Sequence, residues 1–391
     1  MSANDEFALN VEKAVTERYT EGAQTTVAAL CCPVSYDPKY LQILPQEILD
    51  RDYGCGDPSR YVRPGETVLD LGSGGGKICY IAAQIVGSEG RVLGVDMNSE
   101  MLALARKYKD PIGQKLGYTN VTFHRGKIQD LKLDWDVLDA YVRENPIQHG
   151  DDLQRLELFT QELRNQRPMI SDNSVDVVLS NCVLNLVREE DRQNLIAEIY
   201  RVLKPGGRFA ISDIVSDEDI PLQQKNNPEL WSGCISGAFR EDEFLKVFEK
   251  AGFYGISLDK WETTPWQVVE GIEYRSVTVI GYKGKEGPCL ERQQAVIYKG
   301  PWKAVIDDDG HTLFRGERMA VCDKTFGIYT REKGPYANDI FAVNPKEIIS
   351  LESAKLFNCN KNARRHARET KGMDYNETIL SEACCGPDGC C

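Results

Sequence analysis

Four cysteines stand in distinctive sequence contexts around one glycine-rich loop. They are Cys32 in LCCP, Cys55 in DYGCGDP, Cys182 in LSNCVLNLV and Cys234 in LWSGCISGA. The loop, VLDLGSGGGKICY at residues 68–80, lies between the second and the third of them. A loop of this kind suits a nucleotide-like cofactor, and thiolates are ligands for soft atoms. Together they indicate an enzyme that transfers a group from the cofactor to an acceptor held by sulfur.

The cysteine count argues against a disulfide framework. The chain holds 13 cysteines, an odd number, and their spacing matches no secreted scaffold. Its 4 histidines stand far apart, without the spacing that zinc ligands show. We therefore interpret the cysteines as ligands or redox groups, with ordinary buried thiols such as Cys79 among them.

The charge balance restricts the partners. Lys and Arg total 47 against 60 Asp and Glu, and the resulting net charge of −13 argues against binding to nucleic acid or to an anionic membrane. The first residues lack the apolar run of a signal peptide, and no later stretch approaches a membrane span. We expect a cytoplasmic protein.

The glycine-rich loop follows an apolar segment at residues 67–71 and precedes a helical one at residues 78–86. Its glycines permit a tight turn and the close approach of a ligand. The spacing differs from the dinucleotide fingerprint G-x-G-x-x-G, because Lys77 stands where the third glycine belongs. Asp70 suits a ligand with an amine and a sulfonium better than one with a pyrophosphate. The predicted cofactor-binding residues of the loop are Asp70, Gly72, Ser73, Gly74 and Gly76.

Other positions can complete the cofactor pocket. Asp96 ends a second predicted strand, where an acid can bind ribose hydroxyls; the alternative is that it caps the following helix. Met97 can contact the purine, and Ile128, in GKIQDL after a third strand, can lie against the ring. Tyr53 and Asn181 stand beside two of the cysteines and can help to orient the cofactor.

An alternation of strand-like and helix-like segments must position these residues. Strands are predicted at residues 67–71, 91–96, 121–124, 175–180 and 208–213, and helices at residues 78–86, 99–116 and 190–203. Ser99 is the expected N-cap of the second helix, Pro111 a point where it kinks or splits, and KPGG at residues 204–207 ends the third. The alternation predicts an α/β fold, a parallel sheet with helices on both faces. Residues 254–261 and 274–282 are expected to form its antiparallel edge.

Composition divides the chain into four expected regions. Residues 1–66 form an N-terminal cap with Cys31, Cys32 and Cys55, and residues 67–283 form the cofactor-binding domain, with a charged helical insertion at about 132–171. Residues 284–372 form a small C-terminal α+β domain with short strands at residues 295–298, 303–306 and 312–314. Its basic run at residues 362–368 is expected to be a solvated helix face, and residues 373–391 to be a flexible cysteine-rich tail.

The glycine loop, Asp96 and the late KPGG sequence together resemble the class I S-adenosylmethionine-dependent methyltransferases, over residues 67–283. This resemblance implies a Rossmann-like sheet and S-adenosyl-L-methionine as the cofactor. The cysteine contexts are more specific, because DYGCGDP, LSNCVLNLV and ELWSGCISGAF are similar to those of the arsenite methyltransferases. That resemblance implies that Cys55, Cys182 and Cys234 bind trivalent arsenic, and that Cys32 or its neighbour Cys31 takes part in redox chemistry.

The chemistry of arsenic agrees with such a site. Trivalent arsenic is soft, prefers thiolates and attacks through its lone pair, so no general base is required. We expect stepwise methylation of arsenite, with a thiol–disulfide step that returns arsenic to the trivalent state and thioredoxin or glutathione as the reductant. Two alternatives stay open: a methyltransferase for a selenium or organic thiol compound, and a non-catalytic metalloid-sequestering protein.

The other cysteines receive less definite interpretations. The tail pairs Cys384–Cys385 and Cys390–Cys391 either capture metal or arsenic or are dispensable. Three further cysteines are scattered along the C-terminal region and are assigned no role; they are Cys289, Cys322 and Cys359.

Overall fold

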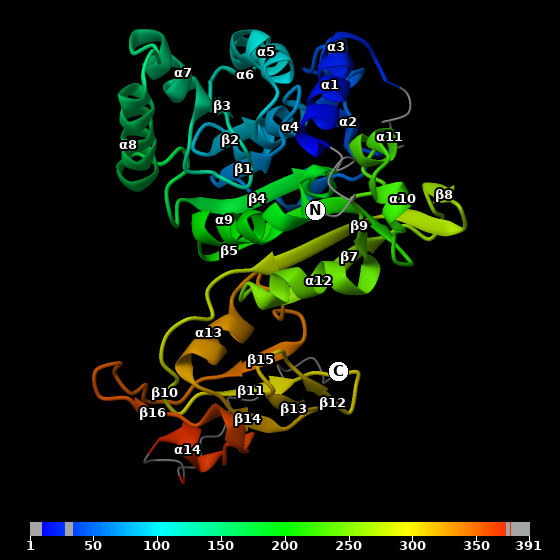
Figure 1. Cartoon of the computed structure of the whole chain (residues 1–391). Helices are drawn as coiled ribbons and strands as arrows, with labels where there is room; N and C mark the ends of the chain where they lie inside the picture. Colours follow the sequence, from blue (N-terminus) through cyan, green and yellow to red (C-terminus); the bar gives the residue numbers. More distant parts are fainter. Residues whose placement is uncertain (1–9, 28–33, 373–375, 377–391) are drawn as a thin grey trace, which may run out of the picture. The chain divides into compact units, whose positions relative to one another are not determined.

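The computed structural model describes residues 10–27, 34–372 and 376, and the chain divides into two compact units, residues 1–284 and 285–391 (Figure 1). Cys31, Cys32 and the four cysteines of the tail lie outside the described residues. Within the described ranges, no helix combines the length and the apolar character needed to cross a membrane.

A mixed sheet of nine strands forms the centre of the N-terminal unit, in the order β3-β2-β1-β4-β5-β9-β7, with β6 beside β5 and β8 beside β9. The first five strands of this order run parallel, and β9 is antiparallel to both β5 and β7. The strand order reverses between β1 and β4, the place where open α/β sheets bind ligands. The strands are β1 (Thr67–Leu71), β2 (Arg91–Asp96), β3 (Val121–Arg125), β4 (Val175–Asn181), β5 (Leu203–Ser216), β6 (Phe239–Arg240), β7 (Tyr254–Trp261), β8 (Gln267–Val269) and β9 (Ile272–Tyr282).

Helices cover both faces of this sheet, and successive strand residues alternate between two cores. Val68 packs with α4 (Lys77–Val86), α5 (Ser99–Lys107) and α6 (Lys109–Leu116), whereas its neighbour Leu69 packs with α9 (Arg192–Val202) and α12 (Glu241–Lys250). Because both faces of the sheet are covered, most positions of β1 and β4 are buried, and most of the buried positions are apolar. The predicted α/β fold with an antiparallel edge is confirmed.

Helices at the carboxyl edge of the sheet cover the region of the predicted site. They are α1 (Val11–Gln24), α3 (Gln46–Leu49), α10 (Leu222–Lys225) and α11 (Pro228–Ser232), whereas α2 (Pro38–Leu41) and the 3-10 helix Pro58–Tyr61 pack on α4. Val11 and Val15 of α1 pack on Trp231 of α11. Arg18 strengthens this contact, because its guanidinium donates to the carbonyl of Glu229 at 2.7 Å. These contacts join α1 to α11, although Arg18 and Glu229 are 211 residues apart in the chain.

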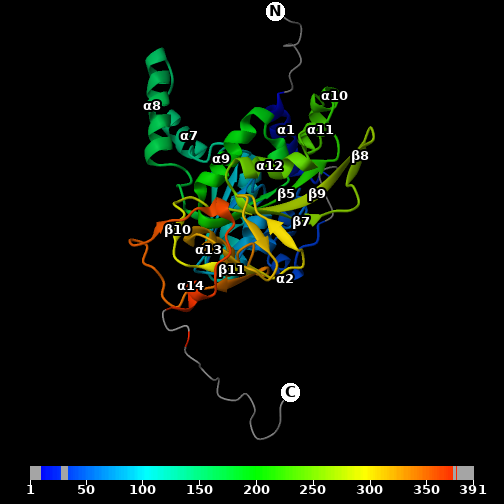
Figure 2. The ribbon, with the colours of Figure 1, turned by 90° about the horizontal axis from the view of Figure 1, so that it is seen from below.

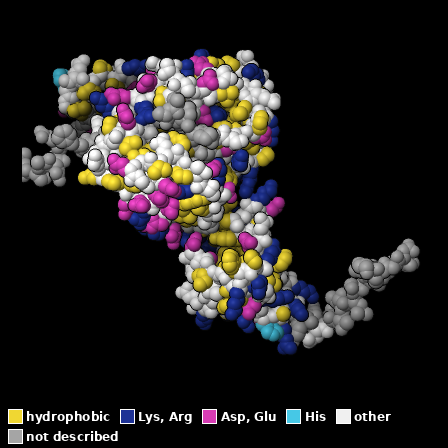
Figure 3. Space-filling view, turned by 90° about the vertical axis from the view of Figure 1, so that its right-hand side faces the viewer, with side chains coloured by type: hydrophobic (Ala, Val, Ile, Leu, Met, Phe, Trp, Pro, Cys, Tyr) yellow, Lys and Arg dark blue, Asp and Glu magenta, His cyan; other side chains and the backbone are white. Residues whose placement is uncertain are grey.

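The charged insertion forms a helical hairpin of α7 (Trp135–Glu144) and α8 (Gly150–Gln166), joined by stacking of Tyr141 on Phe159 at 3.9 Å between ring centroids. Figures 1 and 2 both show α8 projecting from the sheet, whereas α7 is joined to β3 by the ion pair of Arg125 with Asp136 at 3.3 Å. On the face of the molecule seen in Figure 3, acidic and basic side chains are interspersed.

Three local predictions were wrong or incomplete. The N-cap of α5 is Asn98, not Ser99, because the Asn98 side chain accepts from the backbone N–H groups of Glu100 and Met101, both at 3.0 Å. The helix at residues 99–116 is split into two, as Pro111 predicted, but the two helices meet at Tyr108, three residues earlier. The third helix begins at Arg192 after a 3-10 turn, rather than at residue 190.

The predicted turn of KPGG between the third helix and the next strand is wrong. KPGG lies inside β5, since Val175 pairs with Leu203 and Val177 pairs with Arg208, which leaves residues 204–207 as a bulge. Gly206 adopts a left-handed φ of 84° there, which a residue with a side chain rarely adopts.

The C-terminal unit is built on short strands. β11 (Ala295–Tyr298) pairs with β14 (Arg318–Ala320) and β15 (Ile340–Val343), β12 (Ala304–Ile306) with β13 (Thr312–Phe314), and β10 (Leu290–Glu291) with β16 (Lys355–Leu356). Two helices, α13 (Asp323–Thr330) and α14 (Arg368–Lys371), complete it. Residues 362–368 are mostly exposed, as predicted, but they do not form the predicted helix, because α14 begins only at Arg368. Arg365 is buried because it pairs with Glu291 at 2.7 Å and with Glu369 at 3.0 Å.

Candidate active site

A pocket at the carboxyl ends of β1, β2 and β4 contains most of the predicted cofactor-binding residues. It encloses about 1150 Å³, open solvent included, and α1 contributes Glu12, Val15, Thr16 and Tyr19 to its wall. The predicted residues in the wall are Tyr53, Asp70, Gly72, Ser73, Gly74, Asp96, Met97, Ile128 and Asn181. Gly76 is not in the wall; it is the N-cap of α4, with a φ of 86°.

The glycine loop brings backbone close to the pocket and to the strands behind it. Gly72 has a φ of 70°, and a Cβ on it would lie 2.5 Å from the Val183 side chain. Ser73 is buried, and its hydroxyl has no hydrogen-bond partner among the described residues. A buried hydroxyl without a partner is costly, so a polar ligand in this pocket would satisfy it. This observation fits a nucleoside-type cofactor.

Two buried carboxyl groups define the electrostatics of the pocket. Asp96 accepts from the backbone N–H groups of Gly74 and Asn98, both at 2.8 Å, and so fixes the loop to the end of β2. Burial raises the pKa of Asp96, although these hydrogen bonds oppose the shift. Burial also raises the pKa of Asp70 to about 7, even though the Cys79 thiol donates to it at 3.2 Å. A cationic ligand beside Asp70 would favour its ionised form.

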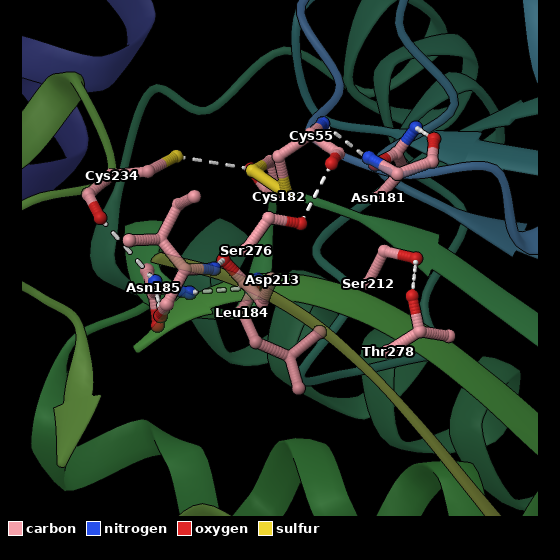
Figure 4. Close-up of a disulfide and its surroundings, with 12 residues drawn as sticks. Cys55, Asn181, Cys182, Leu184, Asn185, Ser212, Asp213, Cys234, Ser276 and Thr278 are labelled. Atoms are coloured by element: carbon pink, nitrogen blue, oxygen red, sulfur yellow. Dashed lines mark hydrogen bonds between the residues drawn. A yellow bond between two sulfur atoms is a disulfide. The ribbon is translucent and has the colours of Figure 1, made fainter. Parts of the chain in front are cut away.

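The structure places Cys55, Cys182 and Cys234 in one buried cluster (Figure 4). Cys55 and Cys182 form a disulfide with a Cα–Cα distance of 5.8 Å, whereas the sequence predicted unoxidised ligands. Two cysteines at this separation can be bridged without movement of the backbone. The thiol of Cys234 points toward this disulfide and donates to the Cys182 carbonyl at 3.1 Å. Cys182 also lines the pocket, so the cluster adjoins the cofactor site.

Asn181 holds the Cys55 loop against the end of β4. Its side-chain oxygen accepts from the backbone N–H groups of Cys55 at 2.9 Å and of Gly56 at 3.0 Å, and its amide donates to the Gly56 carbonyl at 2.8 Å. The Cys55 carbonyl accepts in turn from the Ser276 hydroxyl of β9 at 2.7 Å. We predicted that Asn181 orients the cofactor; the structure gives it these positioning contacts besides a place in the pocket wall.

The glycines beside the cysteines serve close approach rather than an unusual backbone angle. A Cβ on Gly54 would lie 2.0 Å from the Asn181 amide nitrogen, and one on Gly56 would lie 2.4 Å from the Ser212 hydroxyl. The cysteines themselves carry the unusual angles, with φ of 60° at Cys182 and 62° at Cys234. Non-glycine residues in this region are strained, and such strain is frequent at functional sites.

Asp213 was missed by the sequence analysis. Its carboxylate lies with the sulfurs of Cys55 and Cys182 in a group whose ligand atoms are all within 4.8 Å of one another. It accepts from the backbone N–H groups of Leu184 at 2.9 Å and Ile214 at 2.8 Å, while burial raises its pKa to about 7. The available signal was its place near the carboxyl end of a predicted strand.

Tyr19 was missed as well, and the sequence carried no signal for it. It lies on α1, lines the pocket and contacts Cys234. Burial raises the pKa of its phenol well above the usual value, and Cys234 raises it further. Tyr53 has its hydroxyl 2.9 Å from the Gly22 carbonyl, so it ties the same helix to the pocket wall.

Known proteins share this architecture and part of this sequence. A family model described as a methyltransferase domain matches residues 63–167 and 152–252, and a domain of unknown function matches residues 285–375. The chain is 32% identical to the arsenite methyltransferase of Aquipseudomonas alcaligenes over 76% of this chain and 80% of that one. It is 31% identical to the arsenite methyltransferase of Homo sapiens over 78% of this chain and 74% of that one.

A crystal structure from Chlamydomonas reinhardtii, of an arsenic(III) S-adenosylmethionine methyltransferase, matches with a TM-score of 0.54 and 27% identity. The match covers 84% of this chain and all of that one. The fold and the cofactor pocket define this protein as a class I methyltransferase, an enzyme class that uses S-adenosylmethionine. Within that class, the chain belongs to the arsenite methyltransferase family.

Proposed function

We propose that this enzyme methylates trivalent arsenic, held by the thiolates of Cys55, Cys182 and Cys234, beside S-adenosylmethionine in the pocket at the ends of β1, β2 and β4. The observation that carries the proposal is the cluster of these three buried cysteines against the cofactor pocket. The curated relatives are named for the same activity.

Bound in this pocket, S-adenosylmethionine would supply an electrophilic methyl group. Asp96 and Asp70 both line this pocket; Asp96 would accept hydrogen bonds from the ribose hydroxyls, and Asp70 would face the cationic part of the cofactor. Asn181 positions Cys55 and so sets the distance between the sulfur cluster and the pocket. The acceptor loses no proton, so the chain needs to align the reacting atoms rather than to supply a base.

Oxidation state controls the cluster. Arsenic binds thiolates, so the disulfide of Cys55 and Cys182 must be reduced before the site can take its substrate. Transfer of the methyl group raises arsenic formally from trivalent to pentavalent. Two thiols return it to the trivalent state by forming a disulfide, which thioredoxin or glutathione then reduces. We propose Cys32 or Cys31 as a participant in this step.

Cys234→Ser tests the proposal, because Cys234 lies outside the disulfide. The variant should lose methylation of arsenite by at least about 100-fold, since a hydroxyl is a poor ligand for a soft ion. Its Kd for S-adenosylmethionine should stay within about threefold of wild type, because Cys234 is not in the pocket wall. Methylated arsenic is measured by chromatography with elemental detection, and the Kd by calorimetry.

Three outcomes would contradict the proposal. Retained arsenite methylation in Cys234→Ser would remove Cys234 from the ligand set. Formation of S-adenosylhomocysteine by the wild type only with a selenium or organic thiol compound would identify another acceptor. Arsenite binding without S-adenosylhomocysteine would indicate a sequestering protein.

A further inference from the structure

The C-terminal unit contains a second group of three cysteines. Cys289, Cys322 and Cys359 are separated by more than thirty residues each along the chain, yet their sulfurs all lie within 4.8 Å of one another. Cys322 is fully buried, and the other two are partly exposed. The sequence analysis assigned these cysteines no role, and the structure shows that they are not scattered in space.

Short pairings fix two of these cysteines side by side. Cys289 directly precedes β10, and Cys359 follows β16, the strand that pairs with β10. The pairing extends past the strands, because the backbone N–H of Phe357 donates to the Cys289 carbonyl at 2.9 Å. Arg365 stabilises β10 through its ion pair with Glu291 at 2.7 Å. The backbone of the unit therefore holds this pair of thiols near each other.

The third thiol belongs to the start of α13. Cys322 is the N-cap of that eight-residue helix, and its sulfur accepts from the backbone N–H of Thr325 at 3.4 Å. Arg292, next to β10, pairs with Asp323 in the first turn at 2.7 Å, which ties the helix to the other two cysteines. Burial raises the pKa of Cys322, but hydrogen bonds from Thr325 and the two other thiols outweigh burial and lower it. These contacts fix the sulfur of Cys322 beside the sulfurs of the other two cysteines.

We propose that Cys289, Cys322 and Cys359 form a second binding site for trivalent arsenic, outside the catalytic unit. Binding exchanges ligands without any redox step: three S–H groups and arsenous acid, As(OH)₃, give three As–S bonds and three molecules of water. The choice of arsenic as the ion rests on the proposed function. The geometry itself calls for a soft ion that is satisfied by three sulfurs.

Three sulfurs suit arsenic better than zinc. Structural zinc takes four ligands in a tetrahedron, and among the described residues this group offers three ligand atoms. Trivalent arsenic completes its coordination with three sulfurs and a lone pair, which can point to the exposed side of the two half-buried cysteines. A partly exposed site also lets arsenous acid enter and water leave.

Protection from alkylation tests the proposal on the intact, reduced chain. Sodium arsenite at a few equivalents should slow N-ethylmaleimide labelling of Cys289 and Cys359 together by at least about tenfold, as read by peptide mass spectrometry. Dimethylarsinous acid, which can hold a single thiol, should protect them far less. Cys322→Ala should weaken the arsenite protection of both partners, because two thiols bind arsenic more weakly than three.

Equilibrium stoichiometry gives a second readout. In gel filtration with sodium arsenite, the double variant Cys289→Ser/Cys359→Ser should carry one arsenic per chain fewer than wild type. Both positions are partly exposed, so serine should leave the fold intact, and circular dichroism checks this. An unchanged arsenic count, or protection by zinc chloride but not by arsenite, would overturn the proposal.

The two proposals fail separately. The Cys234→Ser variant should keep arsenite protection of the C-terminal thiols. If wild type fails to methylate arsenite but the protection persists, the proposed activity is wrong and the second site stands. If arsenite is methylated and the three thiols stay reactive, only the second site is refuted.

Discussion

Gly54→Ala should displace the loop that carries Cys55 and so slow methylation of arsenic. A Cβ at this position would lie 2.0 Å from the side-chain nitrogen of Asn181 and 2.5 Å from its Cγ. These separations are far inside van der Waals contact. Gly54 is not among the residues with a positive φ, so the entire effect of the substitution is steric.

The magnitude follows from the hydrogen bonds that Asn181 makes. The new methyl group fits only if the Asn181 amide moves, which breaks its hydrogen bonds with Cys55 and Gly56. Overpacking of a buried site costs about 1–3 kcal/mol. Each of these hydrogen bonds contributes about 1 kcal/mol. A loop facing such a cost should shift by on the order of 1 Å, and misplacement of that size lowers an enzymatic rate by about 100-fold.

Gly150→Ala is the matched control, because it adds the same methyl group where a Cβ meets no atom within 4 Å. It should keep the wild-type rate and the wild-type melting temperature. Methylated arsenic is quantified over time for both variants, and calorimetry with S-adenosylmethionine separates loss of the cofactor from displacement of the cysteine. A rate for Gly54→Ala within about threefold of wild type would show that the contacts of Asn181 do not place Cys55.

Two further changes test the pocket and the core. Burial raises the pKa of Asp70 from 3.8 to about 7, so between these values the folded chain holds a proton that the unfolded chain has lost. The free energy of unfolding should therefore fall as the pH rises toward 7, and melting curves of Asp70→Asn should show a smaller fall; an equal fall would contradict the assignment. Phe248→Ala removes a buried ring that stacks on Phe209 at 4.3 Å, and should cost about 3–5 kcal/mol and roughly 10 °C in the melting temperature. Phe314→Ala, at a partly exposed position, should cost far less, and equal losses would refute the role of the Phe248 contact.

The sheet could be predicted from the sequence because its parallel strands are buried on both faces. Mostly apolar runs such as residues 67–71 and 175–180 leave a clear signal, and the glycines after residue 71 mark the end of the first. Details that depend on a choice between neighbours could not be predicted. Asn98 and Ser99 are both good N-cap residues, and only the hydrogen bonds to Glu100 and Met101 decide between them. KPGG has the composition of a turn. The residues on either side of it, Leu203 and Arg208, both pair with β4, so KPGG becomes a bulge in β5.

The candidate site divides in the same way. The glycine loop and the cysteine contexts are local patterns, so the sequence could point to them. The contribution of Asp213 depends on the turn after Cys182 folding back onto β5, which no local pattern encodes. The cluster around Cys322 depends on β10 and β16, two strands of two residues each. Strands this short have no measurable periodicity, so the proximity of their cysteines emerges only from the tertiary structure.

The backbone around the sulfurs shows how the fold maintains an unfavourable arrangement. Cys182 and Cys234 both adopt left-handed angles that cost an L-residue about 1–2 kcal/mol each. The turn after Cys182 is stabilised by Asp213, which accepts from the backbone N–H of Leu184 at 2.9 Å. Asn185, in the same turn, donates to the Cys234 carbonyl at 3.3 Å and so connects this turn to the second strained residue. Glycine would remove the strain at either position but also remove the sulfur. The proposed arsenic site would explain the strain at these two positions, because it requires sulfur at both, and the core on both faces of the sheet supplies the stability that tolerates the strain.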